Sequence, residues 1–295
     1  MNLLPFRLPP LIESGPLPYW NGSAFIVGNS ENKILEYSEN FQGWNDELTQ
    51  FHEDHAGENH AIDSASRAHT LTQIQQYSNI PNPIILEVGC SSGFMLKEFH
   101  KVMPNAILIG ADIVREPLLN LAKQMPNTPL LRFDLTNCPL PDNSIDVVVL
   151  LNILEHIEND VAALEHVYRI LKPGGIAIIE VPAAPNLYDL HDKLLLHFRR
   201  YSLNHLIALT KNTGFSIAKK SHLGCFIYPG FWLIKQKNKR LFFKSEAQQK
   251  RTIEKNIQYT RQNMFLSSII KLELLLGKYV EYPFGIRCLL TVRKT

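Results

Sequence analysis

Residues 84–93, IILEVGCSSG, combine an apolar run of strand length with a carboxylate and a loop of small residues, and residues 94–98, FMLKE, continue as a helix. A buried strand that enters a helix through such a loop brings a ligand close to N–H groups at the helix N-terminus. Gly89 and Gly93 supply the backbone angles that a tight strand-to-helix turn requires. The stretch therefore predicts a parallel α/β sheet with a nucleotide-type ligand beside its first strand.

Strand and helix patterns alternate downstream of this stretch. Further strands are predicted over residues 107–111, 130–133, 145–151 and 176–181. Asp112 closes the second strand, 19 residues after Gly93, where an acid can accept hydrogen bonds from both hydroxyls of a ribose. The alternation predicts a doubly wound α/β sheet. Beyond it we expect a helix over 203–212, a sixth strand over 215–218, an amphipathic helix over 264–276 and a seventh strand over 285–293.

Five sequence blocks carry a resemblance to a known family: LEVGCSSG, GADI, RFDL, PLPDNSIDVVVLLNILEHI and RILKPGG. In order and spacing they resemble the class I S-adenosylmethionine-dependent methyltransferases, in particular the type 11 group related to the ubiquinone and menaquinone methyltransferases. The resemblance covers roughly residues 84–217. It implies a Rossmann-like sheet of seven strands in which the last strand is antiparallel and lies between the fifth and the sixth. The family often has a glycine where Ser91 stands.

A nicotinamide-dependent dehydrogenase is the alternative for a glycine loop after a strand. Its fingerprint is G-x-G-x-x-G, whereas the loop here reads G-C-S-S-G. The order of the five blocks favours the methyltransferase.

The sequence predicts four parts of the chain. Residues 1–78 form an N-terminal extension, irregular and proline-rich over 1–19, with helices that cover the cofactor. Residues 79–222 form the cofactor-binding core, 223–284 a helical and basic insertion, and 285–295 the last strand, which completes the core.

The resemblance implies S-adenosylmethionine as methyl donor and S-adenosylhomocysteine as product, without a metal. The residues that it places around the cofactor are Glu87, Gly89, Cys90, Ser91, Gly93, Asp112, Ile113, Asp134, Leu135 and Asn152. Asp112 is expected to hold the ribose hydroxyls, and Asp134 to accept a hydrogen bond from the adenine amino group. The alternative for both acids is a solvated strand end or a helix cap.

His156 is the candidate general base, because it follows the fourth strand and imidazole titrates near neutral pH. An equal alternative is a structural element bonded to the backbone, and Glu155 is interpreted as the beginning of the next helix. A polar cluster after the fifth strand is the candidate acceptor site: Tyr188, His197, Arg199, Arg200 and Tyr201. An ion-pair clasp that fixes the loop is at least as good an interpretation of this cluster.

Metal binding is not expected. His52 and His55 lie three residues apart, unlike the histidines of the zinc motif H-E-x-x-H, so a solvated helix face is the better interpretation. The four cysteines form no C-x-x-C pair, and reduced thiols in a cytoplasmic protein are expected.

The acceptor is expected to be a small molecule or a lipid-like compound such as a quinone. No Asn-Pro-Pro-Tyr type tetrapeptide follows the fourth strand, which disfavours methylation of adenine or glutamine nitrogens. Residues 226–244 combine aromatic and basic side chains and suggest peripheral contact with an anionic membrane, although no apolar run is long enough to span a bilayer. The alternative is that 226–234 packs over the sheet and the lysines form a solvated face.

Two other functions stay open. One is a non-catalytic partner that binds the cofactor, although such a scaffold has no need of the carboxylate of Asp112. The other is RNA methylation aided by the basic segment, which the acidic early region disfavours, while the net charge of +2 argues neither for nor against an acidic partner.

Overall fold

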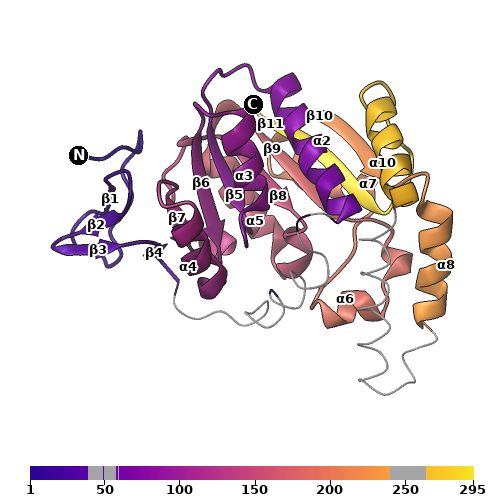
Figure 1. The fold of residues 1–295 in the computed structure, drawn as a ribbon, viewed down its shortest axis with the longest axis horizontal. Coiled ribbons are helices and arrows are strands. Elements are labelled where there is room, and N and C mark those ends of the chain that lie inside the picture. Colours follow the sequence, from indigo (N-terminus) through magenta and orange to yellow (C-terminus); the bar gives the residue numbers. More distant parts are fainter. Residues whose placement is uncertain (39–48, 50–57, 59, 240–263) are drawn as a thin grey trace.

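An eight-stranded sheet forms the centre of the computed structural model, which describes residues 1–38, 49, 58, 60–239 and 264–295 (Figure 1). Across the sheet the strands are β10 (Phe215–Leu223), β11 (Arg287–Lys294), β9 (Leu171–Pro182), β8 (Ile145–Leu151), β5 (Ile84–Val88), β6 (Ile107–Asp112), β7 (Leu130–Arg132) and β4 (Leu35–Glu36). Strand β11 runs antiparallel to both of its neighbours, β9 and β10. The predicted doubly wound sheet, with its last strand inserted antiparallel between the fifth and the sixth, is confirmed.

In this sheet, β4 is the one strand that the sequence does not predict. It comes from the N-terminal extension and pairs in parallel with β7, Leu35 opposite Leu131 and Glu36 opposite Arg132. The carboxylate of Glu36 also accepts from Arg115 Nε and Arg132 Nη1, both at 3.0 Å. Backbone pairing and ion pairs together attach the extension to the edge of the sheet.

The N-terminal extension folds further than its proline-rich composition predicts. A small antiparallel sheet contains β1 (Tyr19–Trp20), β2 (Phe25–Val27) and β3 (Ser30–Asn32). Within residues 1–19, predicted to be irregular, Leu4 and Leu8 are buried in the main hydrophobic core. Burial of these apolar side chains holds a segment that has little regular structure of its own.

Helices cover both faces of the sheet, which explains why its central strands are mostly apolar. The helices are α2 (Ala61–Tyr77), α3 (Phe94–Val102), α4 (Arg115–Gln124), α5 (Asp160–Ile170), α6 (Leu190–Leu194), α7 (Leu203–Asn212), α8 (Tyr228–Lys239) and α10 (Met264–Gly277), with short 3-10 helices η1 (Leu135–Asn137), η2 (Leu154–His156) and η3 (Pro185–Leu187). One hydrophobic cluster contains side chains of α2, α3 and α4, and a second contains those of α5 and α7. Alternate residues of β5 belong to alternate clusters: Leu86 to the second and Ile85 to the first.

The insertion between β10 and β11 contains α8 and α10, which lie at the same end of the molecule (Figure 1). The buried carboxylate of Glu273 on α10 accepts hydrogen bonds from the backbone N–H groups of Gly224, Cys225 and Phe226, at 2.6, 3.0 and 3.0 Å. Three N–H donors on one carboxylate fix the start of α8 against α10. The predicted basic residues Arg240 and Lys244 lie outside the described residues.

Among the helices that the structure describes, none has the length and hydropathy that crossing a bilayer requires.

Candidate functional site

A cavity of about 450 Å³ lies where β5, β6 and β8 end, and α2, η2 and α8 contribute its other walls. Ligands of open α/β sheets bind at this edge. All but one of the predicted cofactor residues line it: Glu87, Gly89, Cys90, Ser91, Asp112, Ile113, Asp134, Leu135 and Asn152. The exception is Gly93, where an added Cβ would lie 2.4 Å from Leu121 Cδ1. Gly93 therefore serves the packing of α3 against α4.

The loop after β5 turns its backbone toward the cavity at two residues with positive φ. Gly89 has φ +75°, and an added Cβ there would lie 1.9 Å from Ile153 Cδ1. Ser91 has φ +43°, a left-handed conformation that glycine adopts without strain. The N–H groups of Gly89 and Cys90 both donate to the carbonyl oxygen of Ala111, at 2.8 and 3.0 Å, and so hold the loop against β6.

Replacing Gly89 by alanine is expected to lower stability by about 1–3 kcal/mol, because the new side chain meets Ile153 and the backbone is strained at positive φ. Gly230→Ala is the matched control, since a Cβ at Gly230 on α8 has no neighbour within 4 Å. Thermal unfolding followed by circular dichroism should give a lower midpoint for Gly89→Ala and an unchanged or higher one for Gly230→Ala. Equal midpoints for the two variants would contradict this account of the loop.

Asp112 is buried, with 8% of its surface exposed, and joins β6 to the loop after β5. Its Oδ2 accepts a hydrogen bond from the N–H of Ser91 at 2.8 Å, and its Oδ1 one from the N–H of Val114 at 3.0 Å. A solvated strand end does not describe this residue. Its carboxylate is held at the cavity wall by the same backbone that forms the loop.

Asp134 has a capping role as well as a place in the cavity wall. Its Oδ1 accepts from the N–H and the hydroxyl of Thr136, both at 2.8 Å, at the start of η1. The helix-cap alternative is therefore correct as a description of its local contacts. Its predicted contact with adenine remains a prediction.

Burial raises the pKa of two groups at this end of β5, Glu87 and Cys90. It raises the pKa of the Glu87 carboxyl well above its ordinary value, and the neighbouring charge of Asp112 adds to this. Burial likewise raises the pKa of the Cys90 thiol. A thiol kept protonated is a poor nucleophile, so Cys90 contributes bulk to the wall instead of reactivity.

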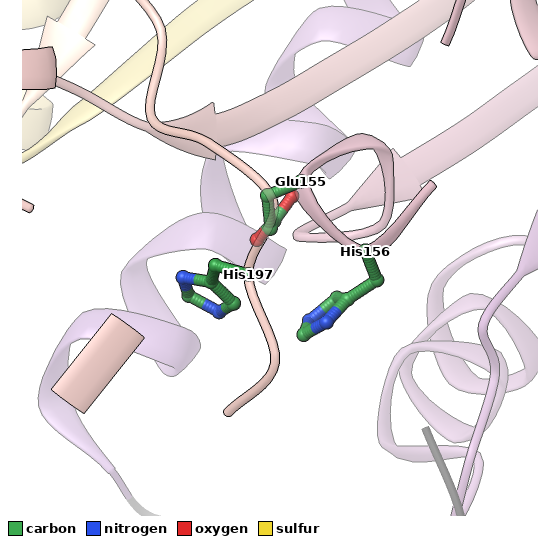
Figure 2. A group of neighbouring side chains, drawn as sticks. All are labelled: Glu155, His156 and His197. Carbon is green, nitrogen blue, oxygen red and sulfur yellow. The ribbon is translucent and has the colours of Figure 1, made fainter. Parts of the chain in front are cut away.

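Glu155, His156 and His197 converge on the cavity (Figure 2). The first two come from η2, after β8, and His197 from the loop after α6. Glu155 is fully buried, and neither carboxyl oxygen has a hydrogen-bond partner among the described residues. Burial, reinforced by the charge of Glu180, raises the pKa of Glu155 to about 8. The rings of His156 and His197 meet edge to face with their centroids 4.7 Å apart.

The interpretation of Glu155 as the start of the next helix is wrong. Helix α5 begins at Asp160, and the side chain of Asn159 caps it by accepting from the N–H of Ala162 at 3.1 Å. The polar residues 158–160 supply the helix start, and the chain between them and β8 forms η2. Glu155 is thereby free to point into the cavity wall.

A buried ion network lies beside this group. Asp192 Oδ1 is 2.9 Å from His197 Nδ1 and accepts from Arg200 Nε at 2.8 Å. Lys235 Nζ on α8 donates to Asp189 Oδ1 at 2.6 Å and to Asp192 Oδ2 at 3.3 Å. Burial alone would raise the pKa of Asp192, but the hydrogen bond from His197 and the charges of Lys235 and Arg200 outweigh it and hold that pKa well below its usual range.

Lys235 is one of the basic residues of 226–244, for which the sequence predicts either a solvated face or contact with lipid. Both interpretations are wrong for this residue, which is 3% exposed and paired with two aspartates. Phe231 and Lys235 of α8 line the cavity, so the insertion contributes to its wall.

The structure brings only two of the five predicted acceptor residues, His197 and Arg200, into the cavity wall. The hydroxyl of the fully buried Tyr201 donates to Asp160 Oδ2 at 2.7 Å, and Arg199 Nη1 lies 2.7 Å from the same atom. The hydroxyl of Tyr188 donates to the carbonyl of His197 at 2.7 Å. These three residues fix the loop, as the ion-pair clasp alternative holds.

Sequence reasoning missed a polar wall formed by α2, β9 and β11. Arg287 donates to Glu180 Oε1 and to Asp63 Oδ1, both at 2.6 Å, and the hydroxyl of Ser66 donates to Glu180 Oε1 at 2.6 Å. Arg287 and Asp63 are 224 residues apart in the chain, so no local pattern connects them. Of the histidine-rich segment considered for metal, His52 and His55 lie outside the described residues.

Comparisons with known proteins agree with this geometry. A family described as a methyltransferase domain matches residues 86–179. A Mycolicibacterium smegmatis protein named "Probable S-adenosylmethionine-dependent methyltransferase" is 28% identical over 144 residues, 48% of this chain and 54% of its own. A demethylmenaquinone methyltransferase of Chlamydia trachomatis is 30% identical over 118 residues, 38% of this chain and 52% of its own. The chain thus spans about half the length of these relatives.

Among solved structures, an S-adenosylmethionine-dependent methyltransferase from Mesorhizobium loti superimposes with a TM-score of 0.52. The match covers 79% of this chain and 99% of the other at 15% sequence identity. A likeness at this level of identity supports the fold.

Proposed function

We propose that this chain moves the methyl group of S-adenosylmethionine to a small-molecule or lipid-like acceptor, because residues 86–179 match a family described as a methyltransferase domain. The observation that carries the proposal is the buried carboxylate of Asp112 at the end of β6, held beside the glycine loop by two backbone N–H groups. An acid at this place suits the two hydroxyls of a ribose.

The residues of the cavity fit S-adenosylmethionine in size and chemistry. Gly89 lets the ligand approach the backbone, and Asp112 offers a carboxylate to the ribose. In this proposal Ile113 packs against the adenine, which Asp134 and Leu135 bind, while Glu87, Cys90, Ser91 and Asn152 surround the methionine part. When bound, the cofactor supplies a methyl group that its sulfonium already activates, so the protein has mainly to align the acceptor and remove its proton.

His156 is the proposed group for that proton. It is half-buried and lines the cavity from η2. This short helix follows β8, the strand next to β5 in the sheet. A neutral imidazole accepts a proton near physiological pH. Arg200 and His197, which line the same cavity, are the proposed acceptor contacts.

Calorimetric titration with S-adenosylmethionine and with S-adenosylhomocysteine tests the proposal. We expect binding in the micromolar range for both, and no binding of NAD, which separates the methyltransferase from the dehydrogenase. Methyl transfer from labelled S-adenosylmethionine to quinones and lipids then separates an enzyme from a non-catalytic partner. A folded, ligand-free sample that binds neither compound would contradict the proposal.

Peripheral contact with an anionic membrane is proposed for the outer sides of α8 and α10. Both helices expose apolar side chains: Trp232, Leu233 and Ile234 on α8, and Leu272, Leu275 and Leu276 on α10. Lys237, Lys271 and Lys278 are exposed among them, whereas the acid of α10, Glu273, is buried. Exposed apolar groups flanked by cations suit a lipid surface with negative headgroups. The relative named as a demethylmenaquinone methyltransferase acts, by its name, on a quinone, which supports a lipid-like acceptor.

Co-sedimentation with vesicles of anionic phospholipid at low salt tests this contact. The chain should bind, and a Trp232→Ser, Leu233→Ser variant should bind at least fivefold less, because each loses apolar area that would enter the headgroup region. Val102→Ser is the control, since Val102 is an exposed apolar residue at the end of α3. Equal sedimentation of the three proteins would contradict membrane contact. Sedimentation that does not depend on the charge of the vesicles would contradict it as well.

A further inference from the structure

The group formed by Glu155, His156 and His197 has the donor set of a metal centre. Each residue offers one ligand atom, a carboxylate oxygen or an imidazole nitrogen, and these three atoms lie within 4.8 Å of one another (Figure 2). Ligand atoms around a bound zinc ion lie roughly 3–4 Å apart, given bond lengths of about 2.0–2.2 Å. Small rotations of the three side chains would therefore bring them to coordination distance.

Glu155 supplies an independent observation that points to a ligand here. It is completely buried, it lines the cavity, and its two oxygens have no hydrogen-bond partner in the described part of the chain. Leaving a buried carboxyl without partners costs about 1–3 kcal/mol or more. A cation bound at the cavity wall would give this side chain the partner that the protein lacks.

His197 is held as a metal-binding histidine is usually held. Its Nδ1 lies 2.9 Å from the buried carboxylate of Asp192, and a carboxylate in this position fixes the ring and leaves Nε2 to coordinate. Asp192 in turn accepts from Arg200 and Lys235, so its own position is fixed. This second layer of contacts orients the ring before any ligand arrives.

The surrounding charges leave room for a cation. The nearby positive groups of Arg200 and Lys235 are matched by the carboxylates of Asp189 and Asp192, with contacts of 2.6–3.3 Å. The positive Arg287 is likewise matched by Glu180 and Asp63. A metal ion would therefore meet a balanced environment, and Glu155 would bind it as the carboxylate, with release of its proton.

The ligand types restrict the metal. Two imidazoles and one carboxylate suit zinc, iron(II) and similar first-row ions, whereas magnesium and calcium prefer oxygen ligands. Three protein ligands leave at least one coordination position open, and the open side faces the cavity that all three residues line.

We propose that Glu155, His156 and His197 bind a divalent first-row transition cation and present its open position to an oxygen atom of the methyl acceptor. The metal-binding part stands alone, and the acceptor part rests on the proposed function. In this arrangement His156 is a ligand instead of the general base, because a bound metal ion itself lowers the pKa of a coordinated hydroxyl group. This proposal differs from the expectation, drawn from the sequence, that the chain binds no metal.

Titration of chelator-treated protein with Co²⁺ alone tests metal binding without any methyl donor. We expect one Co²⁺ per chain with visible absorption bands of a four- or five-coordinate ion, displacement by Zn²⁺, and no displacement by Mg²⁺. Glu155→Gln and His197→Gln should each weaken binding at least tenfold. His156→Gln, at a half-buried position in η2, gives a third variant whose side chain lies outside the hydrophobic core.

The control is His191→Gln, because His191 lines the same cavity but does not belong to the group. It should bind Co²⁺ within twofold of the unchanged protein, and circular dichroism verifies that each variant is folded. Absence of binding, or equal binding by folded Glu155, His156 and His197 variants, would overturn the metal site. S-adenosylmethionine titrated into the same samples tests the proposed function separately, since loss of one kind of binding leaves the other measurable.

Discussion

Asp112→Ala is expected to weaken binding of S-adenosylmethionine at least a hundredfold. In the structure this carboxylate holds the N–H groups of Ser91 and Val114, and in the proposed complex it also accepts from the ribose hydroxyls. Hydrogen bonds to a charged group contribute about 1.5–3 kcal/mol each, so the loss of two contacts with the cofactor corresponds to a factor of a hundred or more. Calorimetric titration measures the effect directly.

Two further variants make this result interpretable. Asp112→Asn keeps the volume of the side chain but has one acceptor oxygen instead of two, so its affinity should lie between those of the unchanged protein and of Asp112→Ala. Asp142→Ala removes an exposed acid whose partner is Arg169, remote from the cavity lining, and should leave binding unchanged. Retention of full affinity by Asp112→Ala would show that the ligand lies elsewhere.

Lys235→Met is expected to destabilise the protein by about 3–5 kcal/mol. The ammonium group is the shared partner of Asp189 and Asp192, which are both fully buried, and removing it leaves their charges only partly compensated. Methionine retains most of the apolar length of lysine, so the loss reports on charge more than on packing. Urea unfolding followed by fluorescence measures the change in the free energy of unfolding.

The matched control for this variant is Lys237→Met. Lys237 lies two residues further along α8 and is exposed, so its replacement should change stability by no more than about 0.5 kcal/mol. A cost below about 1 kcal/mol for Lys235→Met would mean that the two aspartates are compensated without it. In that case α8 would not be fixed over the cavity by this network.

The sequence predicted the sheet because the strands that build it carry their signal locally. β5 and β8 are buried on both faces and are therefore apolar except for one acid each, and Asp112 and the glycine loop follow at fixed spacing. Strand β4 escaped notice because two residues contain no period, and its pairing with β7 depends on a segment nearly a hundred residues away.

The candidate site was predictable only where one element supplies the whole pattern. The cofactor loop meets this condition, and most of its residues line the cavity. Glu155 and Lys235 do not meet it. A charged residue is predicted to be exposed unless the sequence also reveals the residues that pack against it or pair with it. Lys235 reaches Asp189 across 46 residues, and Glu155 is buried by the packing of η2 beneath the loop of His197. Tertiary contacts decide such positions.

The position of β11 has a consequence for the order in which the protein assembles. This strand lies inside the sheet, between β9 and β10, although its residues come after those of every other strand that the structure describes. Its Arg287 also binds Asp63 and Glu180, which leave the ribosome long before it. In a nascent chain that ends before residue 287, β9 and β10 therefore lack the strand that pairs with both of them. Asp63 and Glu180 likewise lack the guanidinium group of Arg287. The polar wall of α2, β9 and β11 can therefore be completed only once β11 occupies the gap between β9 and β10.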